Sequence, residues 1–169
     1  MENSKQARLL LKKQLADLNK NPVDGFSAGL IDDDNLFQWE VMVLGPPETF
    51  YEGGFFKAHL IFPPEYPQKP PKMKFVVDFW HPNVSKEGDV CISILHEPGE
   101  DKYGYEKPEE RWLPVHTVET ILLSVISMIA DPNDESPANV DAAKEWRKDY
   151  NGAFKKNVRK CVRKSQECL

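Results

Sequence analysis

The sequence predicts an α+β domain in which the helices are segregated from an antiparallel sheet. One helical pattern opens the chain, four strand-like runs follow with short links, and three helical patterns close it. Short links between consecutive strands favour an antiparallel meander, because parallel strands need long crossover connections. With 169 residues and a hydrophobic fraction of 40%, the chain can bury one core. We therefore expect a single domain over residues 1–169.

The first helix is expected to begin near Ser4, whose hydroxyl can cap it. It should end before Asn21, since the residue before a proline avoids the α-helical conformation. Its apolar residues recur at intervals of three and four, which makes one buried stripe. This stripe consists of Ala7, Leu11, Leu15 and Leu18.

The four strands are expected at residues 27–31, 36–44, 55–62 and 73–79. In the second run, side chains alternate between two faces, as in a half-buried strand. One face carries Phe37, Trp39, Val41 and Val43.

After Trp80 the chain becomes irregular. A turn-rich segment, 81–89, leads into a short apolar run, 90–95, and then into a long acidic loop at about 96–111. Three helices are expected after this region: 118–130 capped by Thr117, 139–147, and 150–164 capped by Asp149.

Charge and composition exclude several classes of protein. The net charge of −5 combines basic ends, +3 over residues 1–20 and +6 over 144–169, with −14 over 21–143. No basic patch is interleaved with aromatic residues, which argues against nucleic-acid binding. The longest apolar stretch is too short to span a bilayer, and the first residues lack the apolar segment of a signal peptide. Three cysteines without a CxxC pair argue against disulfide or zinc chemistry. We expect a soluble protein of the cytoplasm or nucleus.

Cys91 is the strongest candidate for chemistry, because it ends a turn-rich segment that can present a side chain at the surface. A cysteine near a histidine and an asparagine, here His81 and Asn83, suggests a thiol nucleophile. A cysteine between valine and isoleucine is, however, more often a small core residue. His81 is expected to fix its turn by a hydrogen bond, whereas the Asn83 amide can donate to an oxyanion without titrating.

These three residues lack the base and orienting group of a thiol protease. A nucleophilic Cys91 is therefore expected to exchange with an acyl group that is already activated. Cys161 and Cys168 have no partner group, so we interpret them as structural or incidental.

Five motifs occur in order along nearly the whole chain: Phe62-Pro63-Pro64-Glu65-Tyr66-Pro67-Gln68-Lys69-Pro70-Pro71, His81-Pro82-Asn83, Gly88-Asp89-Val90-Cys91-Ile92-Ser93-Ile94-Leu95, Trp112 and Asp131-Pro132-Asn133. Together they resemble the ubiquitin-conjugating enzymes. The most specific part is the His-Pro-Asn triplet ahead of a cysteine that an apolar run follows. The loop of residues 96–111 is longer than in minimal members, so the chain is most similar to the acidic-loop subgroup and, within it, to the G-type enzymes.

The resemblance implies a ubiquitin-conjugating fold and a transfer reaction. Cys91 would take ubiquitin as a thioester from the activating enzyme and pass it to a lysine of a substrate or of ubiquitin. A RING-type or other ubiquitin ligase would assist, and polyubiquitination and protein degradation would follow. Asn83 would stabilise the oxyanion and orient its loop, and His81 would support the fold around Asn83. No metal or other cofactor is implied, because ATP is used in the earlier activation step.

The resemblance also implies contact surfaces. Basic residues of the first helix would meet the activating enzyme, although a solvated helix face is the simpler explanation of their charge. A ligase would use this helix, the 63–71 connection and the stretch 112–115. Near the acceptor-lysine channel, Ser136 stands where many members carry an acid, and Asp134 or Glu135 would cover that role. The other residues concerned are Lys5, Arg8, Lys12 and Lys13 on the helix, with Gln68, Trp112 and Pro114 for the ligase; Gln68 stands where many members carry an apolar anchor.

The acids of the long loop follow Cys91 closely in sequence; they are Glu97, Glu100, Asp101, Glu106, Glu109 and Glu110. Negative charge near a thiol disfavours the thiolate, so the loop is expected to raise the pKa of Cys91. Attraction of a cationic lysine, or ordering against bound ubiquitin, is the functional interpretation. A solvated insertion is the simpler one.

Two other functions compete with conjugation. The stretch Pro63-Pro64-Glu65-Tyr66 fits the PPxY ligand of WW domains. A segment between two strands is better explained as an ordered connection, with a cis bond between Tyr66 and Pro67. A scaffold variant that binds ubiquitin without conjugating it would lack the cysteine, which this chain has.

Overall fold

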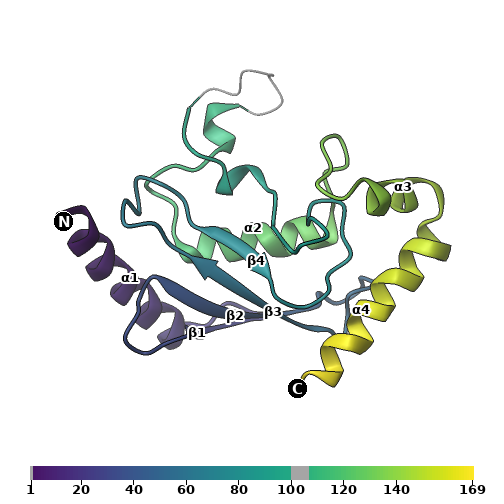
Figure 1. Cartoon of the computed structure of the whole chain (residues 1–169), viewed down its shortest axis with the longest axis horizontal. Helices are drawn as coiled ribbons and strands as arrows, with labels where there is room; N and C mark the ends of the chain where they lie inside the picture. The colour runs from purple at the N-terminus through teal and green to yellow at the C-terminus, as the bar shows by residue number, and fades with distance from the viewer. Residues whose placement is uncertain (1, 100–106) are drawn as a thin grey trace.

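The computed structural model describes residues 2–99 and 107–169. Four antiparallel strands form one sheet in the order β1-β2-β3-β4, with helices before and after it (Figure 1). The predicted α+β class and the meander are confirmed. The elements are α1 (Glu2–Lys20), β1 (Phe26–Leu30), β2 (Gln38–Leu44), β3 (Phe55–Ile61), β4 (Lys72–Phe75), η1 (Ser93–Leu95), η2 (Pro108–Glu110), α2 (Val118–Ala130), α3 (Val140–Lys148), η3 (Tyr150–Phe154) and α4 (Lys155–Glu167).

Helix α1 begins earlier than predicted. It starts at Glu2, so Ser4 lies inside the helix and its prediction as the cap was wrong. No glycine or proline precedes Ser4 to break the helix. The stripe is confirmed, since Ala7 and Leu11 are fully buried and Leu15 and Leu18 pack against the core.

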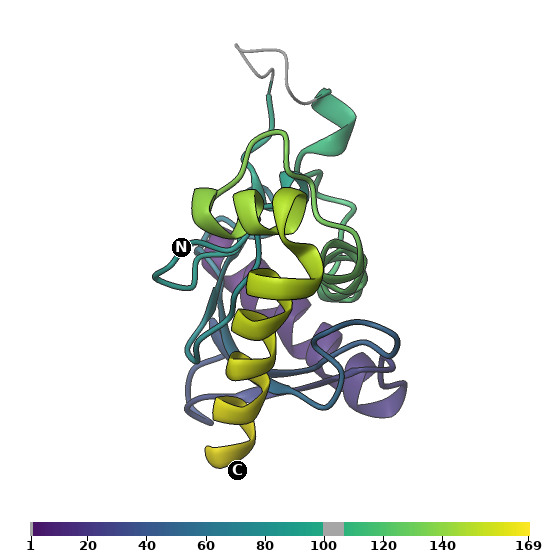
Figure 2. The same ribbon diagram turned by 90° about the vertical axis from the view of Figure 1, so that its right-hand side faces the viewer.

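The sheet and helix α2 make the core. The predicted alternation in β2 is confirmed, because Trp39, Val41 and Val43 are fully buried. They belong to the same buried cluster as Ile121 and Val125 of α2. Figure 1 shows α1 and α4 at opposite ends of the molecule. In Figure 2, turned so that α4 faces the viewer, α1 lies behind it.

Strand β4 is shorter than predicted because an aromatic stack ends it. The rings of Phe75 and Phe79 lie 4.2 Å apart with an interplanar angle of 5°. Four residues of extended strand would separate them by about 13 Å, so the chain has to turn between them. On its free edge, β4 pairs with the segment that leads to Cys91: Phe75 N–H donates to the Gly88 carbonyl at 2.8 Å and Val90 N–H to the Met73 carbonyl at 3.0 Å.

The proline-rich connection between β3 and β4 is ordered. The Tyr66–Pro67 bond is cis, as predicted. Tyr66 is only 1% exposed, and its hydroxyl lies 3.0 Å from Gln14 Oε1. A WW domain needs an accessible tyrosine, so the structure contradicts that alternative.

The predicted caps Thr117 and Asp149 are confirmed, and Asn139, expected as the first residue of its helix, is the cap of that helix. The side chains of Thr117, Asn139 and Asp149 accept backbone N–H groups at the starts of α2, α3 and η3. The last predicted helix differs in one respect. Its first turn, η3, is a π-helix, and α4 continues directly from it.

Candidate active site

Cys91 follows a short hairpin on the edge of β4. Val84 pairs with Val90 across this hairpin, and the backbone N–H of Cys91 donates to the Asn83 carbonyl at 2.9 Å. Gly88 has φ +103°, and a Cβ there would meet the Phe75 carbonyl oxygen at 2.2 Å, so the turn requires glycine. The hairpin therefore holds the Cys91 backbone while leaving its side chain exposed.

An open hollow of about 760 Å³ lies beside the Cys91 side chain. Its walls come from several parts of the chain that are distant in sequence: the segment that begins at Cys91, the end of the acidic loop, the second half of α2, and the segment after α2. Residues on these walls include Asn83, Glu110, Ser127, Glu135 and Ser136. The tertiary structure thus makes a reaction site that could admit a long side chain next to the thiol.

His81 is a buried, neutral hydrogen-bonding residue. Its Nδ1 accepts the backbone N–H of Asn83 at 2.9 Å, so its Nε2 carries the proton and donates to the Met128 carbonyl at 2.8 Å. Burial disfavours the imidazolium and lowers the pKa of His81 to about 4. This geometry matches the expected role in supporting the turn, and both ring nitrogens are occupied.

The Asn83 side chain clamps the active-site turn to the segment after α2. Its Nδ2 donates to the Asn133 carbonyl at 2.6 Å, and its Oδ1 accepts the Asn133 N–H at 2.9 Å. An amide nitrogen has two hydrogens, so one Nδ2 hydrogen stays available for a further acceptor. Asn83 lines the hollow although it is only 4% exposed.

The thiol of Cys91 has a raised pKa. The larger cause is burial around the sulfur, and the smaller is the negative charge of Asp89. The predicted direction agrees with this result, but the charge comes from Asp89 rather than from a described acid of the loop. The resting cysteine is therefore a thiol at neutral pH.

The three acceptor-side candidates separate into two groups. Glu135 and Ser136 line the hollow beside Cys91. Asp134 instead pairs with Arg147 of α3, whose guanidinium contacts both its carboxylate and its carbonyl. This contact lowers the pKa of Asp134, so of the two adjacent acids it is Glu135 that lines the hollow without being held by Arg147.

The acidic loop closes near the site. Trp112 N–H donates to the His96 carbonyl at 3.0 Å, and Arg111 Nη1 donates to the Glu97 carbonyl at 3.3 Å, so the two ends of the loop meet. Glu109 and Glu110 line the hollow, and Glu97 is exposed. Glu100, Asp101 and Glu106 lie outside the described residues.

The predicted partner contacts are exposed with one exception. Trp112 is fully buried, and its Nε1 donates to the Pro67 carbonyl at 2.7 Å. The prediction that Trp112 contacts a ligase directly was therefore wrong. Its side chain instead joins the 63–71 connection to the stretch before α2. The exposed candidates are Lys5, Arg8, Lys12, Lys13, Gln68 and Pro114.

Sequence reasoning missed three residues that shape this region. Gln14 is buried within the apolar stripe of α1, and its Oε1 accepts both the Tyr66 hydroxyl and the Val118 N–H at 3.0 Å. A glutamine spaced three from Leu11 and four from Leu18 was the available signal. Asp89 lies two residues before Cys91, so its place beside the cysteine in the sequence was a signal as well. For Arg147 the sequence carried no such signal, since it acts on Asp134 across 13 positions.

Comparisons with known proteins agree with this geometry. Residues 10–162 match the family model described as ubiquitin-conjugating enzyme. The chain is 72% identical over 162 residues to the probable ubiquitin-conjugating enzyme E2 7 of Caenorhabditis elegans, over 96% of this chain and 98% of that protein. It is 51% identical over 158 residues to ubiquitin-conjugating enzyme E2 G2 of Homo sapiens, over 92% of this chain and 95% of that protein. A structure of human ubiquitin-conjugating enzyme E2 G1 is similar with a TM-score of 0.66 and 68% sequence identity, covering 74% of this chain and 95% of that chain.

The fold, the cysteine beside a His-Pro-Asn turn and these matches define a transferase of the ubiquitin pathway. The chain belongs to the ubiquitin-conjugating enzyme family, and the predicted likeness to the G-type enzymes is confirmed. A thioester intermediate is the general kind of reaction in this family. Membership implies ubiquitin, an activating enzyme and ubiquitin ligases as partners. Among the described residues, no helix is long and apolar enough to cross a membrane.

Proposed function

We propose that Cys91 carries ubiquitin as a thioester and releases it to a lysine that approaches through the hollow. One observation supports this assignment above the others: the Cys91 side chain is exposed beside the hollow while its backbone N–H is held by Asn83. Cys161 is buried on the inner face of α4, and Cys168, although exposed, is not among the residues that line the hollow.

Loading is an exchange between two thioesters. The Cys91 thiolate attacks the carbonyl carbon at the end of ubiquitin, and the thiolate of the activating enzyme leaves. Bond types on the two sides are the same, so a strongly acidic thiol is not needed. The raised pKa of Cys91 keeps the free enzyme protonated, which protects the exposed sulfur from oxidation.

Discharge to lysine places a greater demand on the site. The neutral amine attacks the same carbonyl carbon, an oxyanion forms, and the Cys91 thiolate leaves. The remaining Nδ2 hydrogen of Asn83 would donate to this oxyanion while the clamp to Asn133 holds the amide in place.

Glu135 would receive the incoming lysine. Its carboxylate attracts the ammonium form and can take up the proton that the amine must lose. The Asp134 carboxylate is paired with the Arg147 guanidinium, so it would act by ordering the segment. Ser136 would shape the wall of the hollow.

The exposed surfaces would serve the larger partners. Lys5, Arg8, Lys12 and Lys13 would raise the association rate with the activating enzyme, an effect that salt weakens. The exposed Gln68 and Pro114 lie on the two segments that Trp112 joins, and they would contact a ligase.

The acidic loop would act on the acceptor rather than on the thiol. Glu109 and Glu110 face the same hollow as Cys91. Attraction of a cationic lysine, or ordering of the loop against bound ubiquitin, would then influence which lysine attacks.

The reaction would need no metal or other cofactor, because the arriving thioester already holds the energy of ATP. We place the enzyme in the cytoplasm or nucleus, where its free thiols stay reduced. Its products would be polyubiquitin chains that mark proteins for degradation.

The decisive experiment is a loading reaction with ubiquitin, activating enzyme and ATP. Wild-type protein should form an adduct that dithiothreitol removes. Cys91→Ser should form an oxygen ester that resists dithiothreitol and yields to alkali, while Cys161→Ser and Cys168→Ser load normally. A Cys91→Ala protein that still loads through another cysteine would overturn the assignment.

A further inference from the structure

Helix α4 carries an unusual run of positive charge on its outer face. Between residues 155 and 164 it has six basic residues and no acidic residue: Lys155, Lys156, Arg159, Lys160, Arg163 and Lys164. They recur three and four positions apart, so like charges face each other along the helix. Such pairs destabilise a helix by themselves, so each of these residues needs either a partner in the fold or another explanation.

Three of these six residues contact the rest of the protein. Lys155 lies over the Phe50 ring at 5.6 Å, and Arg159 donates to the carbonyls of Phe50 and Glu52 at 2.9 and 2.7 Å. Lys164 pairs with Asp78 at 2.8 Å. These residues flank the buried face of α4 and have structural partners.

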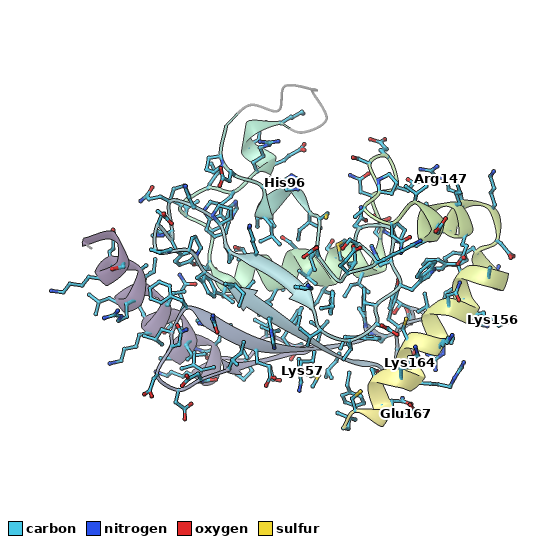
Figure 3. The ribbon with its side chains drawn as sticks, viewed as in Figure 1. Lys57, His96, Arg147, Lys156, Lys164 and Glu167 are labelled. Atoms are coloured by element: carbon cyan, nitrogen blue, oxygen red, sulfur yellow. The ribbon has the colours of Figure 1, made fainter. Side chains whose placement is uncertain are left out.

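The other three, Lys156, Lys160 and Arg163, lie directly opposite the buried face. Successive helical residues turn by about 100°, which puts these three on one line and the buried Val158 and Val162 on the other side. All three are exposed, and none has a hydrogen bond or ion pair within the described part of the chain. Figure 3 shows Lys156 on the outer side of α4 and Lys164 on the side toward the sheet. We call this line the outer α4 stripe.

We propose that the outer α4 stripe is a docking site for a short acidic segment of a protein partner. The three cations lie close together without a hydrogen bond or ion pair, and Glu167, one turn beyond Arg163, is the one acid on their line within α4. They therefore repel one another in the free protein, and a partner with aspartates or glutamates would remove that cost. Where a sequence lowers local stability without a structural gain, the residues concerned often serve a function. The buried apolar face of α4 keeps the helix in place despite the charges.

The charge of the rest of the molecule, and the exposed side chains and length of the stripe, favour an acidic peptide over nucleic acid or a membrane as the ligand. Residues 21–143 carry a net −14, which would repel a long polyanion such as nucleic acid. Between Lys155 and Glu167 no large hydrophobic side chain is exposed, so a membrane would gain no apolar contact there. The stripe spans about 10 Å of helix, which matches about three residues of an extended peptide.

The position of the stripe gives the docking a purpose. It lies at the opposite end of the molecule from α1 (Figure 1), where the family implies contact with the activating enzyme and ligases. A partner held on α4 would remain bound while α1 exchanges one partner for another. Two linked contacts of this kind raise the effective concentration of the partner.

The test measures binding of a fluorescent polyglutamate peptide by anisotropy, at low and at physiological salt. Lys156→Gln/Lys160→Gln/Arg163→Gln removes the stripe, and Lys20→Gln/Lys72→Gln/Lys144→Gln removes the same charge at scattered exposed sites. We expect the stripe variant to lose about tenfold in affinity and the scattered variant to lose little. Equal losses in the two variants, or none in either, would overturn the proposal.

Two further measurements complete the design. The stripe variant should be at least as stable to heat as the wild type, because it loses only repulsion; a less stable variant would mean that the charges have a structural role. Duplex DNA and vesicles rich in phosphatidylserine serve as rival ligands. If either binds through the stripe more tightly than the peptide, an acidic protein segment is the wrong occupant. Cys91 loading should be the same in all variants, so this test does not depend on the proposed catalytic site.

Discussion

The buried His81 should make the folding stability of the enzyme fall at acidic pH, and the substitution His81→Gln should reduce this fall. The native state holds this ring neutral, with Nδ1 accepting from Asn83 and Nε2 donating to Met128. Protonation would remove the acceptor at Nδ1 and place a charge in the core. His81→Gln removes the titrating group while keeping an amide that can both donate and accept.

The magnitude follows from linkage. The pKa of His81 falls from 6.5 to about 4 on folding, so the unfolded chain binds a proton that the native state refuses. The stabilisation is complete above pH 6.5 and declines as the pH falls toward 4. The loss amounts to about 2 kcal/mol between pH 7 and pH 4.5, and to about 3 kcal/mol once the pH is well below 4.

Urea unfolding at pH 7 and at pH 4.5, followed by tryptophan fluorescence, measures this loss of stability. His81→Gln should lower stability at pH 7 yet lose about 2 kcal/mol less than the wild type on acidification. His59→Gln, which changes a histidine outside this pair of hydrogen bonds, serves as the control. The rate of lysine discharge should depend on pH in the same way in wild type and His81→Gln. If the wild type and His81→Gln lose the same stability on acidification, the conclusion that His81 is buried and neutral would be refuted.

Three other substitutions test the remaining structure. Asn83→Ala should load ubiquitin but discharge it to free lysine about 10²–10³ times more slowly, as for a lost oxyanion donor; equal losses in loading and discharge would instead mean that only the clamp to Asn133 matters. Gln14→Leu leaves the Tyr66 hydroxyl and the Val118 N–H without an acceptor, so urea unfolding should show a loss of about 2–5 kcal/mol, whereas the exposed Gln6→Leu should change little. Deleting residues 97–110 should leave Cys91 loading near normal and alter the rate or linkage of chain synthesis; identical chains at the same rate, at low and high salt, would mean that the loop has no catalytic role.

Local signals predicted most of the secondary structure. The caps at Thr117 and Asp149 each act within a few residues, so they can be recognised from the sequence alone. The alternation in β2 likewise reports which face is buried. The prediction failed where the packing of a side chain in the folded protein decides. β4 ends early because Phe79 folds back onto Phe75, and Trp112 is buried because the Pro67 carbonyl accepts its indole N–H.

The candidate site shows the same division. The spacing of Cys91 and the His-Pro-Asn turn is written in the sequence, because the hairpin that joins them spans only a few residues. The partners of that turn are not: Asn83 meets Asn133 across 50 positions, and His81 meets Met128 across 47. Which of two adjacent acids lines the hollow also depends on tertiary structure, since Arg147 pairs with Asp134 and Glu135 lies on the wall of the hollow. Short-range backbone preferences can be read along a chain, whereas pairing between side chains far apart in sequence exists only once packing has brought them within hydrogen-bonding distance.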